Sequence, residues 1–78
     1  MRTDSKTSSD FNVLVKVNGE NKFIPLNVSI LKLLETCKIN HDRVVIELNK
    51  EILRKDKFEN TLLIEGDEIE IVTFVGGG

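Results

Sequence analysis

A single stretch with helical spacing lies among segments that otherwise alternate like β-strands, and this contrast limits the folds open to the chain. Ile30, Leu33, Leu34 and Cys37 fall at positions i, i+3, i+4 and i+7, which aligns them along one face of a helix of about ten residues. Ser29 stands just before this apolar stripe and is a suitable N-cap. One short helix can bury its stripe only against a sheet, so the sequence predicts an α+β domain with Cys37 as a small residue of its core.

The flanking segments show the alternation of apolar residues that is typical of strands. Strands are expected over residues 12–17, 22–26, 44–48 and 69–75, and residues 51–54 are expected to form a short strand or an irregular crossing. The dipeptides between them are turn formers, namely Asn18-Gly19, Asn49-Lys50 and Gly66-Asp67. If the last strand pairs in parallel with the first, it lies in the middle of a mixed sheet and its end projects past the sheet.

Composition excludes several classes of function. Eleven Lys and Arg residues against 13 Asp and Glu give a net charge of −2, which lacks the basic surplus of a nucleic-acid-binding protein. One Cys and one His are too few for an internal disulfide, a metal site or an iron–sulfur cluster. No apolar run is long enough to span a bilayer, so no membrane partner is expected.

The short chain also argues against an enzyme. A chain of 78 residues has little room for both a core and an enclosed catalytic pocket. His41 lies in a polar loop and is expected to be solvated rather than catalytic. We therefore expect a carrier or binding protein that has no catalytic residues, no metal and no cofactor of its own.

The two ends of the chain have few apolar side chains that could be buried in a core. Residues 1–10 are polar and rich in Ser and Thr, so we expect a disordered extension there, before a domain at residues 11–75. The sequence closes on Gly76, Gly77 and Gly78, which we expect to form a flexible tail. At about 3.3 Å per residue, three glycines reach roughly 10 Å, so this tail could carry a carboxylate into a channel too narrow for a Cβ atom.

The order of elements and four sequence segments resemble the β-grasp, or ubiquitin-like, fold and, within it, the ThiS family of sulfur carriers. The segments are Ser29-Ile30-Leu31-Lys32-Leu33-Leu34, Val44-Val45-Ile46-Glu47-Leu48-Asn49-Lys50-Glu51-Ile52, Gly66-Asp67-Glu68-Ile69-Glu70-Ile71-Val72 and Gly77-Gly78. The third segment is similar to the family's G-D-x-I-E-I-V motif. The chain departs from the family at Lys50, where many members have Gly. The resemblance covers residues 12–78 and implies a mixed sheet packed on one helix.

The resemblance also implies a function, that of a sulfur carrier in the biosynthesis of the thiazole ring of thiamine. The carboxylate of Gly78 would be adenylated by an E1-like partner of the ThiF type, which uses ATP, and then converted to a thiocarboxylate. Gly76 and Gly77 would thread the tail into the partner's site, and a thiazole synthase of the ThiG type would accept the sulfur. We further expect a cytoplasmic protein that is monomeric when free.

Strand parity predicts where such partners would dock. Ile69 and Ile71 share one face of the last strand and are expected to pack on the helix, so Val72 and Phe74 point to the opposite side. An exposed apolar pair beside a reactive tail is suited to docking, unless residues 18–23 or 55–60 cover it. The acidic residues of this region would either attract a basic partner or form a solvated turn; they are Glu65, Asp67, Glu68 and Glu70.

Three other functions share the glycine tail. A ubiquitin-like modifier would form an isopeptide bond with a lysine, and the small subunit of molybdopterin synthase would be a sulfur carrier bound to a large subunit. A β-grasp interaction domain could also carry the tail incidentally. The Leu48-Asn49 pair and the segment at residues 66–72 favour the thiamine branch.

Overall fold

The computed structural model describes residues 11–74. The strands and helices are β1 (Asn12–Val17), β2 (Glu20–Pro25), α2 (Ile30–Thr36), β3 (Val44–Leu48), β4 (Glu51–Leu53) and β5 (Glu68–Thr73), with 3-10 turns η1 (His41–Arg43) and η2 (Lys55–Lys57). The predictions for residues 1–10, for Val75 and for Gly76, Gly77 and Gly78 lie outside the described residues. No helix in the described part is long and apolar enough to cross a membrane.

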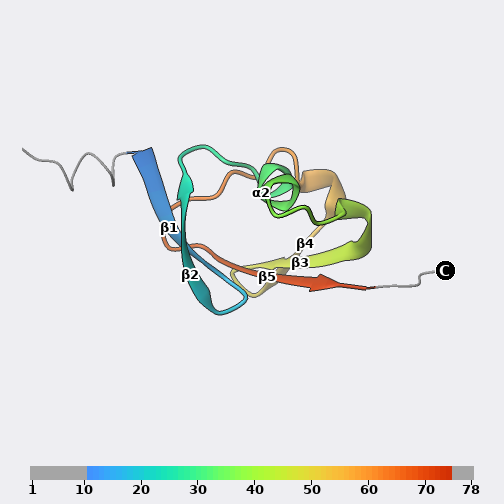
Figure 1. The fold of residues 1–78 in the computed structure, drawn as a ribbon. Coiled ribbons are helices and arrows are strands. Elements are labelled where there is room, and N and C mark those ends of the chain that lie inside the picture. Colours follow the sequence, from blue (N-terminus) through green and yellow to red (C-terminus); the bar gives the residue numbers. More distant parts are fainter. Residues whose placement is uncertain (1–10, 75–78) are drawn as a thin grey trace, which may run out of the picture.

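The five strands form one mixed sheet in the order β2-β1-β5-β3-β4. The last strand pairs in parallel with β1 and lies in the middle, which confirms the arrangement considered from the sequence. On its other side it is antiparallel to β3. Figure 1 shows α2 lying across one side of the sheet and β5 running out toward the C-terminal end of the chain. This is the β-grasp arrangement of a mixed sheet packed on one helix.

The core lies between α2 and the sheet face that the helix covers. The helix contributes Ile30, Leu33 and Leu34, each at most 3% exposed. The other buried apolar side chains come from the strands and the loops around them, namely Val13, Val15, Ile24, Ile46, Phe58, Leu63, Ile69 and Ile71. The opposite face of the sheet, which we call the outer face, is not covered by the helix.

The helix begins where the sequence predicts and ends sooner. Ser29 caps it, because its hydroxyl oxygen accepts a hydrogen bond from the Lys32 N–H at 3.0 Å. Cys37 is already the C-cap, and Lys38 turns the chain with a φ of +60°. The amides of Lys38 and Ile39 close the helix in a Schellman motif. The prediction that Cys37 belongs to the core is therefore wrong, because the chain leaves the helix before the stripe's last position and the thiol is exposed.

Both hairpin turns have a positive φ at their two central residues, as in type I′ turns. In the β1–β2 turn the angles are +51° at Asn18 and +85° at Gly19, and in the β3–β4 turn they are +53° at Asn49 and +73° at Lys50. Asn and Gly tolerate this conformation, whereas the Cβ atom of a lysine crowds the backbone. Of these four turn residues, Lys50 is therefore the one least suited to its backbone conformation.

Replacing Lys50 with glycine is expected to stabilise the domain by about 1 kcal/mol, because it removes the Cβ crowding at a φ of +73°. In a domain of this size, this gain raises the melting temperature by roughly 4–8 °C. Thermal unfolding followed by circular dichroism measures the change. Lys50→Ala is the matched control, since it removes the same charged side chain but keeps the Cβ atom. An equal gain in both variants would contradict the explanation from backbone strain.

Candidate functional site

The candidate site is the end of β5, from which the chain continues toward its glycines. β5 pairs with β3 up to its last residue, Thr73, which lies opposite Val44. One residue further, the Phe74 N–H donates a hydrogen bond to the Arg43 carbonyl oxygen at 2.9 Å. The sheet therefore holds the chain in an extended course as far as Phe74.

The start of β5 is fixed by side chains from two of the segments singled out in the sequence. The Asn49 amide donates to Asp67 Oδ1 at 3.0 Å, and its oxygen accepts from the Glu68 N–H at 2.9 Å. The other carboxylate oxygen of Asp67 accepts from the Ile64 N–H at 2.9 Å. Asp67 is 7% exposed, so these hydrogen bonds satisfy an otherwise isolated buried carboxylate. The Leu-Asn and Gly-Asp segments thus set where β5 begins and which way its side chains point.

The outer face carries an apolar patch at the end of β5. Val72 is 58% and Phe74 46% exposed, so neither residues 18–23 nor residues 55–60 cover the predicted pair. Val45 of β3 lies opposite Val72 in the register. Ile52 of β4 lies opposite Glu47, on the same face. We call Val45, Ile52, Val72 and Phe74 the outer patch.

The sequence predictions missed two members of the outer patch. Val45 is 40% and Ile52 is 65% exposed. The parity of β3 could have identified Val45, because its neighbour Ile46 is fully buried and adjacent residues of a strand face opposite sides. Ile52 follows only once the register of the β3–β4 hairpin is known.

The predicted acidic residues differ in burial and in hydrogen bonding. Asp67 is buried, and Glu65 accepts a hydrogen bond from the Leu14 N–H at 2.9 Å. These two carboxylates serve the fold, so neither a partner-attracting nor a solvated role fits Asp67. Glu65 is itself exposed, and so is the pair Glu68 and Glu70 of β5.

A carboxylate from another strand joins the exposed acidic pair. Glu47 of β3 lies directly opposite Glu70 of β5. Like charges placed opposite each other across two strands repel. A basic partner surface would relieve this repulsion, and the acidic residues lie next to the outer patch on the same face.

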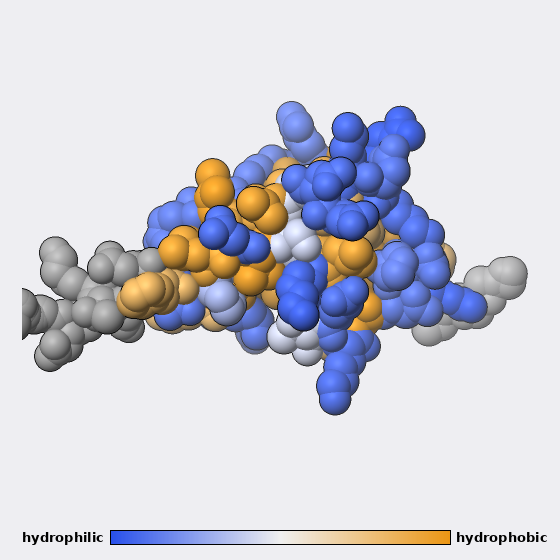
Figure 2. All heavy atoms as spheres, turned by 90° about the horizontal axis from the view of Figure 1, so that it is seen from above, coloured by the Kyte–Doolittle hydropathy of each residue, from blue (hydrophilic) through white to orange (hydrophobic). Residues whose placement is uncertain are grey.

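Near the end of β5, the helix-bearing face has fewer exposed apolar side chains than the outer face. Figure 2 shows mostly hydrophilic side chains on the helix-bearing face toward the C-terminal end, whereas apolar ones gather toward the other end. Exposed apolar residues in the loops of the helix side include Leu26, Leu62 and Ile64. The exposed apolar surface beside the end of β5 therefore belongs to the outer face.

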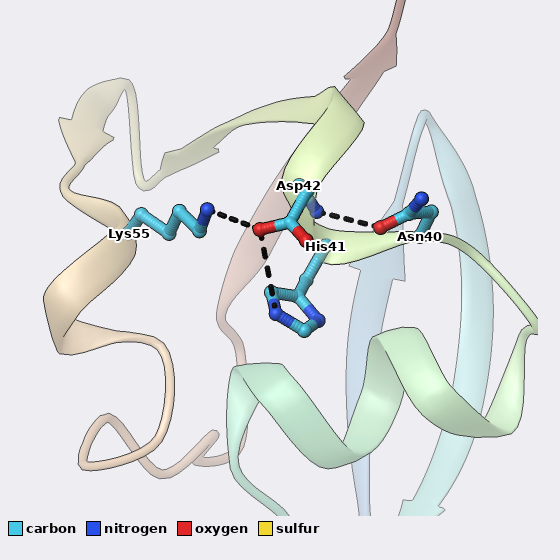
Figure 3. Close-up of polar contacts among 4 residues, drawn as sticks. All are labelled: Asn40, His41, Asp42 and Lys55. Carbon is cyan, nitrogen blue, oxygen red and sulfur yellow. Dashed lines mark hydrogen bonds and ion pairs between the residues drawn. The ribbon is translucent and has the colours of Figure 1, made fainter.

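His41 lies in a surface ion-pair cluster rather than in a catalytic arrangement. Figure 3 shows the Lys55 ammonium and the His41 imidazole on the same side of the Asp42 carboxylate. The hydrogen bond from Lys55, followed by its positive charge, holds the pKa of Asp42 below its ordinary value of 3.8. The Asn40 side chain caps the same turn by accepting from the Asp42 N–H at 2.9 Å. This cluster ties η1 to η2 at the surface of the domain.

Within residues 11–74, no group of three His, Cys, Asp or Glu side chains is placed to hold a metal ion. The Cys37 thiol is free and exposed, and it lies at the end of α2.

Comparison with known proteins identifies relatives over nearly the whole described chain. The family model described as the ThiS family matches residues 14–78. The sulfur carrier protein ThiS of Bacillus subtilis is 36% identical over 66 residues, which cover 83% of this chain and 100% of that protein. A thiazole synthase of Paramagnetospirillum magneticum is 32% identical over 62 residues, which are 80% of this chain but 19% of that protein.

A solved structure has the same fold. The crystal structure of the thiamine biosynthesis protein ThiS from Geobacter metallireducens superposes with a TM-score of 0.73 at 30% sequence identity, covering 85% of this chain and 100% of that one. The mixed sheet, the single helix and the central last strand are therefore shared with a protein of related sequence.

Proposed function

The chain belongs to the ThiS family and is a sulfur carrier of thiamine biosynthesis, and from this premise we propose that Gly78 carries the sulfur as a C-terminal thiocarboxylate. The observation that carries this proposal is that the family match runs through to Gly78. Within residues 11–74, Phe74 is the last residue held by the sheet. The four residues beyond it span at most about 13 Å when extended, which is enough to reach into a partner's site.

The chemistry follows from the weakness of a carboxylate as an electrophile. An E1-like partner of the ThiF type would join the Gly78 carboxylate to the α-phosphate of ATP, which releases pyrophosphate and leaves an acyl-adenylate. A sulfide would then attack the carbonyl carbon and displace AMP, which leaves the thiocarboxylate directly. A persulfide would displace AMP to give an acyl disulfide, and a thiol of the partner would then cleave its S–S bond, which frees the thiocarboxylate and leaves a disulfide on the partner. Gly76 and Gly77 suit a narrow channel because they have no Cβ atom. The chain is thus a co-substrate of its partner, and the ATP belongs to the partner.

A thiazole synthase is the proposed acceptor of the sulfur. In support, the thiazole synthase of Paramagnetospirillum magneticum contains, in 19% of its length, a stretch similar to this chain. Two proteins that work together are well served by one polypeptide, because the tether raises their effective concentration. We propose the same pairing here between separate chains, in the cytoplasm, with a carrier that is monomeric when free.

The outer patch is the proposed docking surface for the adenylating partner. Val72 and Phe74 lie closest along the chain to the tail, and Val45 and Ile52 extend the apolar area across β3 and β4. An apolar centre with an acidic border fits a partner surface that has an apolar centre and a basic border.

The mass of the intact protein tests the proposed function. The chain is produced together with its adenylating partner and a sulfur donor, and we expect a species heavier by the difference between one sulfur and one oxygen atom, located at Gly78 by fragmentation. A chain without Gly78 is the control and should lack this species. Conjugates to lysine would instead support a ubiquitin-like modifier, and a thiocarboxylate that a thiazole synthase does not consume would contradict the thiamine assignment.

A further inference from the structure

β5 extends beyond the end of β1, one of the two strands beside it. The pairing of β1 with β5 consists of Lys16 opposite Glu68 and Val17 opposite Ile69. β1 then ends and the chain turns at Asn18-Gly19 into β2. On its other side, β5 stays paired with β3 as far as Thr73. The last part of β5 therefore has a strand on one edge and, among residues 11–74, none on the other.

The hydrogen bonds show which backbone groups face this unpaired side. The Asn18 N–H donates to the Ile69 carbonyl oxygen at 2.9 Å, and the Ile71 N–H donates to Asn18 Oδ1 at 2.7 Å. The Phe74 N–H points the opposite way, to Arg43. Because backbone groups alternate along a strand, the N–H and carbonyl of Thr73 face the same side as those of Ile71. We call the backbone of residues 71–73 on this side the open edge.

The open edge differs from the two outer edges of the sheet, which have features that discourage pairing with other chains. β2 carries Glu20 and Lys22 and ends at Pro25. β4 has only three residues and is followed by Arg54 and Lys55.

The open edge has no such protection. Residues 71–74 read Ile-Val-Thr-Phe, without a charge or a proline. These residue types favour strand pairing. Val72, Thr73 and Phe74 are all exposed, so the edge can be approached from solvent.

We propose that the open edge pairs, main chain to main chain, with an extended segment of the adenylating partner. This rests on the proposed function, because the partner that acts on Gly78 must lie within about 13 Å of Phe74. β3 already holds β5 in strand conformation, so pairing costs little ordering of this chain. The Thr73 N–H and carbonyl and the Ile71 carbonyl supply the hydrogen bonds, as in β-strand addition. The Asn18 side chain, bonded to the Ile71 N–H, marks the point where the added strand ends.

Amide hydrogen exchange in the wild-type chain tests this pairing directly. We expect the Thr73 amide to exchange quickly in the free protein and at least about tenfold more slowly in the saturated complex with the adenylating enzyme. The Phe74 amide is the internal reference, since it already bonds to Arg43 in the free protein. An unchanged Thr73 rate in the saturated complex overturns the proposal. Protection that appears in the free protein as its concentration rises also overturns it, because a second copy would then occupy the edge.

A matched pair of variants tests how much the hydrogen bonds of the open edge contribute to binding of the adenylating enzyme. Thr73→Pro removes only the N–H that faces the open edge, a position where an edge strand tolerates proline. Thr73→Val keeps the N–H and removes the hydroxyl. We expect Thr73→Pro to raise the Kd for the adenylating enzyme by about tenfold and Thr73→Val to leave it within about twofold of wild type.

The outcomes separate this proposal from the proposed function. If the wild type is adenylated and Thr73→Pro binds as tightly as wild type, only the pairing proposal fails. If the wild type itself is neither bound nor adenylated, the proposed function fails as well. Melting temperatures of both variants show whether the fold is intact, and a Thr73→Pro variant that unfolds leaves the exchange measurement to decide.

Discussion

A chain that lacks Gly78 is expected to support no pyrophosphate release from ATP by the adenylating enzyme, while its melting temperature stays that of the full chain. The reacting group in the proposed mechanism is the carboxylate of Gly78, and a chain ending at Gly77 presents its carboxylate about 3.3 Å short of the partner's site. Mispositioning of a reacting atom by this much removes most of the benefit of an oriented site. Isotope exchange between pyrophosphate and ATP measures the step.

Two controls separate the loss of the carboxylate from the loss of binding. A chain with the Gly78 carboxylate converted to an amide keeps every glycine but removes the nucleophile, so it should also release no pyrophosphate. Both altered chains should still bind the enzyme through the outer patch, and should therefore inhibit adenylation of the wild type. Pyrophosphate release by the amide at the wild-type rate would contradict the role given to Gly78.

Features set by local periodicity were predictable from the sequence. The stripe of Ile30, Leu33 and Leu34, the cap at Ser29 and the glycine-containing turn at Gly19 each depend on residues close together in the chain. The outward direction of Val72 and Phe74 followed from the same period-two alternation and is confirmed by their exposure. Whether they bind a partner stays a prediction.

Features set by an unusual backbone angle or by distant contacts were not predictable in this way. Cys37 fits the helical stripe, but the helix ends before it because Lys38 adopts a positive φ that few lysines adopt. Asp67 looks like a surface residue until Asn49, 18 residues away, is brought beside it. The open edge depends on how far β1 and β5 extend past each other, and only the register shows this.

Replacing Phe74 with aspartate is expected to raise the Kd for the adenylating enzyme by about thirtyfold, the effect of a docking residue worth roughly 2 kcal/mol. A carboxylate at this position would have to lose its water against the apolar centre of the partner's surface. Phe74 is 46% exposed in the free protein, so the substitution should lower the melting temperature by no more than about 4 °C. Titration calorimetry and thermal unfolding give the two quantities independently.

Phe23→Asp is the matched control, because it makes the same chemical change on the same face of the sheet. Phe23 belongs to β2, is 69% exposed and lies opposite Leu14 of β1. β2 is an edge strand of the sheet, and β1 separates it from β5. It is absent from the outer patch, so its replacement should leave the Kd within about twofold of wild type. Equal weakening by both variants would show that net charge rather than the outer patch governs binding. A large loss of stability in Phe74→Asp, with unchanged affinity of the folded fraction, would place Phe74 among the residues that hold the fold rather than those that dock the partner.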